Sequence, residues 1–214
     1  PPPLSRSMRL SLLSTALLAL TFFAAPASAQ TTVVLKGGLN TAFLNGGTST
    51  DGLDPRLGAV GGVGIRYDVT PSLSLQAEAL YSQKGAEDGL VTDPGTYRLD
   101  YLEVPLLARV AIPVSPYADA GVYAGPSIGV PLAAEFRSDN SSALDIDYDG
   151  DLKTDVGIAV GADFWSGPFG VDVRYTAGLQ DAFEDGRGLN DARNGALSLT
   201  LGYRFGGMTG RSRY

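Results

Sequence analysis

Apolar and polar residues alternate along most of this chain, and this alternation limits the possible folds more than any other feature. In residues 194–205, NGALSLTLGYRF, every second position from Leu197 to Phe205 is Leu, Tyr or Phe, whereas the positions between them carry Ser, Thr, Gly or Arg. Because successive side chains of a β-strand point to opposite faces, a period of two predicts a strand with one apolar face. The pattern predicts eight strands, within residues 31–44, 57–69, 72–84, 100–112, 116–130, 153–165, 169–180 and 194–205.

Two of these segments are less regular than the others. The alternation slips before Leu102, where Leu99 and Tyr101 share the parity of the charged Glu103. In 116–130, Pro126 predicts a bulge or an early strand end, because proline cannot donate a hydrogen bond to a neighbouring strand.

The connections between the segments alternate strictly in length. Those after the second, fourth and sixth segments are short and contain proline, whereas the others are long and polar, at about 45–56, 85–96, 137–151 and 182–193. In an up-and-down barrel this order places every long loop at one end and every short turn at the other. The sequence therefore predicts an all-β fold, an eight-stranded antiparallel up-and-down barrel.

The N-terminal region has the layout of a cleavable signal peptide. Met8 and Arg9 give a short basic start, residues 10–25 an apolar core, and Ala27-Ser28-Ala29 a small-residue cleavage site. The chain then divides into upstream residues and signal peptide over 1–29, a barrel over 30–206, and a short periplasmic tail over 207–214.

An eight-stranded barrel can be a soluble one with an apolar interior or a membrane one with an apolar exterior. Here the polar face of the strands mixes many glycines with isolated charges, which suits a narrow interior better than open water. The six basic and six acidic charges of that face balance, as buried charges must. We therefore expect a transmembrane barrel with a lumen charge network of Lys36, Arg66, Glu78, Lys84, Glu103, Arg109, Asp119, Asp155, Asp163, Asp172, Arg174 and Arg204.

Aromatic residues gather at the strand ends next to the short turns and the C-terminus. Membrane barrels carry aromatic girdles at both bilayer interfaces. The sequence predicts one girdle from Tyr67, Phe164, Trp165, Phe169, Tyr203 and Phe205, with Phe43 and Tyr81 at the opposite interface.

Composition argues against several function classes. Without Arg6 and Arg9 of the leader, 14 basic residues stand against 23 acidic ones, a balance unlike that of nucleic-acid-binding proteins. The chain has no cysteine and no histidine, so a histidine-activated nucleophile cannot form. A site made of carboxylates alone, from Glu78, Glu103 and Asp119, is conceivable, but ion pairing explains these residues more simply. We expect no enzyme activity and no cofactor.

One segment has the spacing that opens a calcium-binding loop. Asp145, Asp147 and Asp149 precede Gly150 as in an EF-hand, but the twelfth position is Val156 in place of glutamate. These residues are a calcium candidate, and an acidic solvated loop is the alternative.

Four motifs resemble the PorT-like outer-membrane β-barrel family: YLEVPLLARV (101–110), KTDVGIAVGADF (153–164), VDVRYTAGLQD (171–181) and LTLGYRF (199–205). The resemblance implies an eight-stranded barrel in a bacterial outer membrane. We expect the barrel to be monomeric and surrounded by outer-membrane lipid. It also implies that the final Tyr-x-Phe, Tyr203 to Phe205, is a signal for the barrel-assembly machinery.

Two functions fit these features. The first is a non-enzymatic envelope protein, with a role in envelope structure, adhesion or binding of a still unidentified extracellular or periplasmic protein through four long acidic extracellular loops. The alternative is a transport barrel that passes a small solute through a narrow pore or carries a lipid-like ligand.

Overall fold

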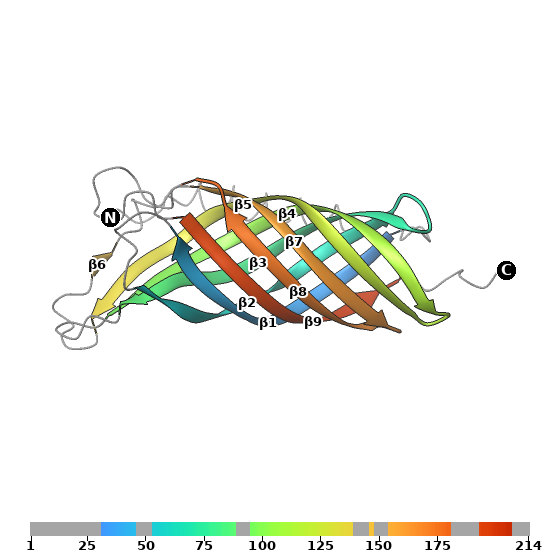
Figure 1. Cartoon of the computed structure of the whole chain (residues 1–214), viewed down its shortest axis with the longest axis horizontal. Coiled ribbons are helices and arrows are strands. Elements are labelled where there is room, and N and C mark those ends of the chain that lie inside the picture. The colour runs from blue at the N-terminus through green and yellow to red at the C-terminus, as the bar shows by residue number, and fades with distance from the viewer. Residues whose placement is uncertain are drawn as a thin grey trace, which may run out of the picture.

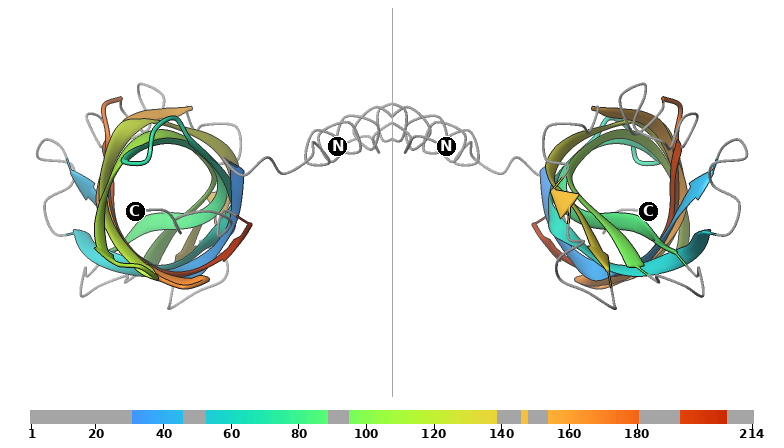
Figure 2. Two further views of the ribbon diagram at one scale, coloured as in Figure 1. Left: turned by 90° about the vertical axis from the view of Figure 1, so that its right-hand side faces the viewer. Right: turned by 90° about the vertical axis from the view of Figure 1, so that its left-hand side faces the viewer.

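Long antiparallel strands wrap around a common axis and close into a barrel (Figures 1 and 2). The computed structural model describes residues 31–45, 53–88, 95–138, 146–147, 154–180 and 193–206. Its strands are β1 (Thr31–Asn45), β2 (Leu53–Asp68), β3 (Leu73–Asp88), β4 (Gly95–Ser115), β5 (Ala118–Ser138), β6 (Ile146–Asp147), β7 (Asp155–Ser166), β8 (Phe169–Gly178) and β9 (Arg193–Phe205).

The eight long strands pair in chain order, and the last pairs with the first. β1 pairs with β2 on one side and with β9 on the other, so the sheet has no open edge along the barrel wall. The short β6 pairs with the end of β5 alone among the described strands. The predicted eight-stranded up-and-down barrel is confirmed. The predicted signal peptide and the tail over 207–214 lie outside the described residues.

The short turns all lie at one end of the barrel. They are formed by residues 69–72, 116–117 and 167–168, and the pairing of Val33 with Phe205 brings the two described ends of the chain to the same place. Gly167 has φ of 56°, a backbone conformation that glycine adopts without steric cost, and its N–H donates to Tyr117 O at 2.8 Å. We call this the turn end and the opposite end the loop end.

At the loop end, four strands are longer than the alternation predicts, and the first of them, β2, begins at Leu53 rather than at residue 57. β3 continues to Asp88 and β4 begins at Gly95, so half of the predicted loop 85–96 is strand. β5 runs on to Ser138, although β7 begins only at Asp155, opposite Gly129. Hydrogen bonds between backbones continue here after the apolar pattern has ended, and a pattern of side chains cannot reveal that.

Pro126 does not end its strand, so the predicted early strand end is wrong. β5 continues through Pro126, which pairs with Ile158 of β7. On the β4 side, Ser127 and Ala124 are paired but the two residues between them are not. The proline therefore lies in a gap of the ladder, where no N–H donor is needed. The register shifts between β4 and β5 lie instead at Asp100/Tyr101 and Pro113/Ser115.

The apolar face of every long strand points outward. Leu201 is 68% exposed and Leu106 54%, whereas their polar neighbours along each strand are buried inside the ring. This confirms the predicted membrane-barrel orientation, with apolar side chains outside. In the part of the chain that the structure describes, no helix has the length and hydrophobicity needed to cross a membrane.

Two adjacent glycines of β1 offer a matched test of this orientation. A Cβ on Gly37 would meet open space, whereas one on Gly38 would overlap Leu199 O and lie 2.7 Å from Thr200 Cα. We expect Gly38→Ala to lower the free energy of unfolding by about 1–3 kcal/mol, as overpacking does. Gly37→Ala should leave it unchanged or raise it slightly. Urea unfolding of the barrel refolded into vesicles measures both, and equal effects would contradict the described backbone packing.

Candidate functional site

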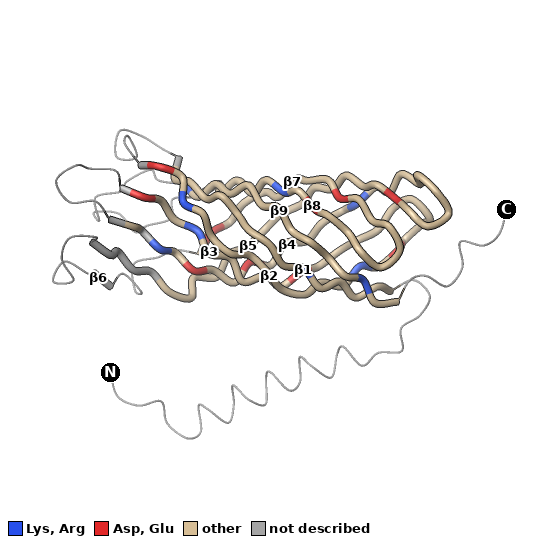
Figure 3. The backbone as a smooth tube through the Cα atoms, turned by 90° about the horizontal axis from the view of Figure 1, so that it is seen from below, with Lys and Arg blue, Asp and Glu red and all other residues tan. Residues whose placement is uncertain are grey.

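The barrel interior holds the chemistry of this molecule. The structure places all twelve predicted lumen charges inside the ring, and Arg204 has the most exposed side chain among them, at 15%. Charged positions of both signs recur from one end of the barrel to the other (Figure 3). They form three groups along the axis.

The turn-end group consists of Arg66, Arg109, Asp119, Asp163 and Arg204. Arg109 lies at its centre and donates to Asp163 through Nε, at 2.8 Å, and to Asp119 through Nη2, at 2.7 Å. Arg66 contacts Asp163 at 3.2 Å, and Arg204 contacts Asp119 at 3.0 Å. Three guanidinium groups therefore surround two carboxylates, an arrangement with charge-assisted hydrogen bonds in several directions.

Trp165 belongs to this end of the lumen, so its predicted place in the interface girdle is wrong. Its side chain is fully buried, and the guanidinium carbons of Arg66 and Arg204 each lie 5.3 Å from its ring centroid. The indole lies against Gly170 and Gly202, where a Cβ would overlap its ring. Trp165 has the same parity as Asp163, which points inward. The girdle prediction was based on the position of Trp165 at a strand end and did not take this parity into account.

The other five predicted girdle residues lie on the outer face near the turn end. Tyr67, Phe164, Phe169, Tyr203 and Phe205 are all exposed. The ring centroids of Phe169 and Tyr203 are 5.3 Å apart and those of Tyr203 and Phe205 4.7 Å, both edge to face. Such a cluster is suited to a lipid headgroup region.

The middle group consists of Lys36, Glu78, Asp172 and Arg174, packed around Tyr123. Lys36 Nζ lies 2.8 Å from Glu78 and 3.2 Å from Asp172, and Arg174 Nη1 lies 2.7 Å from Glu78. Tyr123 donates its hydroxyl to Asp172 at 2.6 Å, and both cations lie within 6 Å of its ring centroid. The ring of Tyr123 thus fills the lumen beside the ion pairs.

Gln76 connects the middle group to the turn-end group. It accepts a hydrogen bond from Arg66 Nε at 2.7 Å and donates one to Glu78. The two groups therefore form one continuous network, although β2 and β8, which carry Arg66 and Arg174, are not neighbours in the wall.

The loop-end group consists of Lys84, Glu103 and Asp155, with Tyr101 and Asn194 beside it. Lys84 Nζ lies 2.5 Å from Glu103 and 3.0 Å from Asp155 and stands 5.2 Å from the ring centroid of Tyr101. Asn194 donates to Asp155 at 3.2 Å. One cation here faces two carboxylates, the reverse of the imbalance at the turn end.

Sequence reasoning missed the large uncharged side chains of the lumen, because it expected small residues there. Tyr101, Tyr123 and Leu107 are all buried inside, and Leu107 and Tyr123 pack with Ala159. The parity that Tyr101 shares with Glu103 was the signal for its inward position. Glycines provide the space: a Cβ on Gly161 would overlap the Tyr123 ring.

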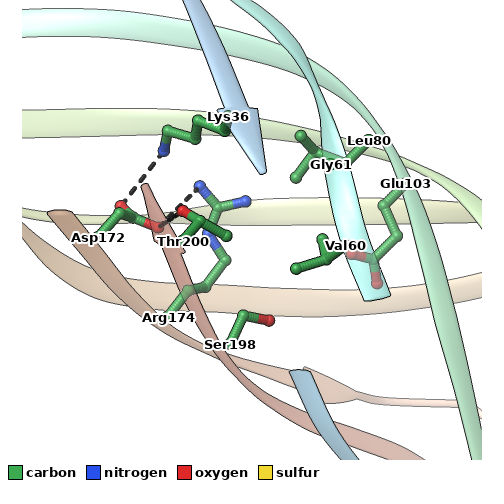
Figure 4. Close-up of a pocket in the computed structure, with 9 residues that line it drawn as sticks. All are labelled: Lys36, Val60, Gly61, Leu80, Glu103, Asp172, Arg174, Ser198 and Thr200. Carbon is green, nitrogen blue, oxygen red and sulfur yellow. Dashed lines mark hydrogen bonds and ion pairs between the residues drawn. The ribbon is translucent and has the colours of Figure 1, made fainter. Parts of the chain in front are cut away.

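A small cavity separates the middle group from the loop-end group. Its volume is about 10 Å³, which is room for about one water molecule. Lys36, Asp172 and Arg174 lie on one side of it and Glu103 on the other (Figure 4). Val60, Gly61, Leu80, Ser198 and Thr200 complete the lining.

The calcium candidate cannot be placed. Asp145 and Asp149 lie outside the described residues, and only the backbone of Asp147 is described, in β6. Among the side chains that the structure describes, no group of three or more Asp or Glu residues could hold a metal ion.

Comparison with known proteins identifies the family. The profile of the "Outer membrane protein beta-barrel domain" family matches residues 26–184. The chain belongs to this family. Its predicted membrane-barrel character and outer-membrane location follow from that membership, whereas the narrower PorT-like assignment rests on the sequence motifs alone. No curated protein sequence matches the chain.

Several solved outer-membrane barrels resemble the structure. They include Ail, the attachment invasion locus protein of Yersinia pestis, which is 16% identical with a TM-score of 0.44 over 82% of this chain and 99% of that one. Neisserial surface protein A is 13% identical with a TM-score of 0.48, over 83% and 98%. Outer membrane protein W of Escherichia coli is 17% identical with a TM-score of 0.42, over 84% and 100%.

Proposed function

We propose that this protein is a non-enzymatic, monomeric outer-membrane barrel that is closed to solutes and serves as a rigid anchor for its long loops. The observation that carries the proposal is the filled lumen. Three groups of ion pairs and the rings of Trp165, Tyr123 and Tyr101 occupy the interior in succession. Eight strands leave an interior that side chains fill, whereas aqueous channels need many more strands.

The rigidity of the anchor has a physical basis. Two lumen groups join strands on opposite sides of the wall: Arg66 of β2 binds Asp163 of β7, and Arg174 of β8 binds Glu78 of β3. Opening a path for a solute would separate such pairs inside a poorly hydrated interior. Each broken pair would leave buried charges uncompensated, at a cost of about 3–5 kcal/mol.

The sequence supports a role for the loops at the cell surface. The signal peptide would direct export, and the barrel-assembly machinery would insert the chain into the outer membrane with both termini in the periplasm. The turn end would then face the periplasm and the four long loops would face outward. Segment 137–151, one of these loops, carries five acidic residues and a single arginine. Acidic loops suit envelope structure, adhesion or binding of a protein partner whose surface is basic.

Conductance measurements test the closed barrel against the transport alternative. We expect the purified protein, refolded into a planar bilayer, to give no reproducible conductance steps, with a 16-stranded porin as the positive control for the assay. Vesicles that contain the protein should release entrapped sugars no faster than empty vesicles. Reproducible steps, or release of one solute class, would overturn the closed barrel and favour the narrow-pore role.

A further inference from the structure

The lumen network is interrupted at one level, and the cavity of about 10 Å³ lies there. Gln76 joins the turn-end group to the middle group, but no hydrogen bond or ion pair among the described side chains joins the middle group to the loop-end group. Figure 4 shows Arg174 and Glu103 approaching the cavity from opposite walls.

Polar atoms that lack partners face this level of the barrel. Arg174 Nη2 has no hydrogen-bond partner among the described residues, and it lies 4.0 Å from Asp172 Oδ1, too far for a hydrogen bond. Glu103 Oε1 contacts Lys84 as an ion pair and makes no hydrogen bond of good geometry. Both side chains are more than nine-tenths buried, and a buried donor left unpaired costs about 1–3 kcal/mol.

The charges around the cavity select a neutral occupant. An anion would lie against Asp172 and Glu103, and a cation would lie against Lys36 and Arg174. The volume fits one water molecule, and a buried water needs two to four polar partners. Arg174 can donate to a water and the Glu103 carboxylate can accept from it, while the Ser198 side chain borders the same space.

We infer that this cavity is a binding site for a single structural water that accepts a hydrogen bond from Arg174 and donates one to Glu103. The water joins the loop-end group to the other two, so that one polar network runs from Arg204 near the turn end to Asp155 near the loop end. The buried side chains of Val60 and Leu80 provide an apolar part of the cavity lining. The water is a fixed part of the filled lumen. This inference does not depend on whether the barrel is closed to larger solutes.

A crystal structure of the full exported chain at a resolution that shows ordered waters tests the site directly. Crystals are grown in parallel in sodium chloride, sodium bromide and rubidium chloride. We expect one density peak within hydrogen-bond distance of Arg174 Nη2 and the Glu103 carboxylate, with no anomalous signal from bromide or rubidium. A peak with either anomalous signal, or a dry cavity, would overturn the inference.

Two substitutions at Ser198 provide a matched pair. Ser198→Val places two methyl groups at the cavity and should abolish the peak, whereas Ser198→Ala preserves the space and should retain it. Both variants should keep the heat-modifiable gel migration of a folded barrel. A peak that survives Ser198→Val would show that the density does not depend on this cavity, and a peak lost in Ser198→Ala would show that the Ser198 hydroxyl, rather than Arg174 and Glu103, holds the water.

Discussion

Replacing Arg109 by leucine is expected to lower the free energy of unfolding by about 3–5 kcal/mol, the cost of removing one partner of a buried ion pair. Arg109 is the main partner of Asp163 and contacts Asp119 as well, and both carboxylates are nearly inaccessible to solvent. Leucine would leave Asp163 with only Arg66 and Asp119 with only Arg204 as an ion-pair partner. Urea unfolding in lipid vesicles, followed by the fluorescence of the single tryptophan, measures the loss.

Two controls separate this effect from a general loss of an arginine. Arg98→Leu removes the ion pair between Arg98 and Asp100, in which the arginine side chain is 39% exposed. This substitution should lower the free energy of unfolding by less than about 1 kcal/mol. Asp163→Asn should destabilise the wild-type barrel more than it destabilises the Arg109→Leu variant, since the uncompensated charge is then already present. Strict additivity of the two substitutions would contradict the described pairing.

Replacing Trp165 by alanine is expected to have a similarly large effect, a loss of about 3–5 kcal/mol. The indole is fully enclosed between Gly170, Gly202 and the guanidinium groups of Arg66 and Arg204. Alanine would leave a cavity that the rigid wall cannot close. The temperature at which the barrel unfolds on a gel should fall, and circular dichroism should show the same shift.

Phe169→Ala is the matched control, because Phe169 also lies at the turn end but points outward, with 65% of its surface exposed. Lipid fills the space that its ring leaves, so no internal cavity forms and the loss should be smaller. If the two variants lost equal stability, or if Phe169→Ala lost more, Trp165 would belong to the interface girdle after all.

The sequence alone predicts the fold and the inward or outward direction of most side chains, because a strand with a period of two has only two faces. Lys36, Glu78 and Arg174 could be placed in the lumen from parity, and the alternation of loop lengths was enough to order the strands. At some positions, another feature, such as an aromatic side chain at a strand end, conflicted with the parity of the residue along its strand. Parity was the better predictor there. Tyr101 and Trp165 both follow the parity of a charged neighbour and both lie inside.

The ion-pair partners could not be predicted from the sequence. Arg109 binds Asp163, which is 54 residues away in the sequence, and Lys84 binds Asp155, which is 71 residues away. These pairings depend on how far the strands tilt and slide when the sheet closes, which no local pattern encodes. The extensions of β2, β3, β4 and β5 could not be predicted for a related reason, since backbone pairing continues there without alternating apolar side chains.

The central claim is that one face of each strand meets lipid and the other a filled, closed interior. The chain has no cysteine, so single cysteines for nitroxide labels can be placed freely along β9. We predict that labels at Leu199 and Leu201 collide readily with oxygen dissolved in the bilayer and that labels at Ser198 and Thr200 reach neither oxygen nor a water-soluble relaxant. Uniform accessibility along 198–201, or access of the water-soluble relaxant to Leu199 and Leu201, would contradict the account.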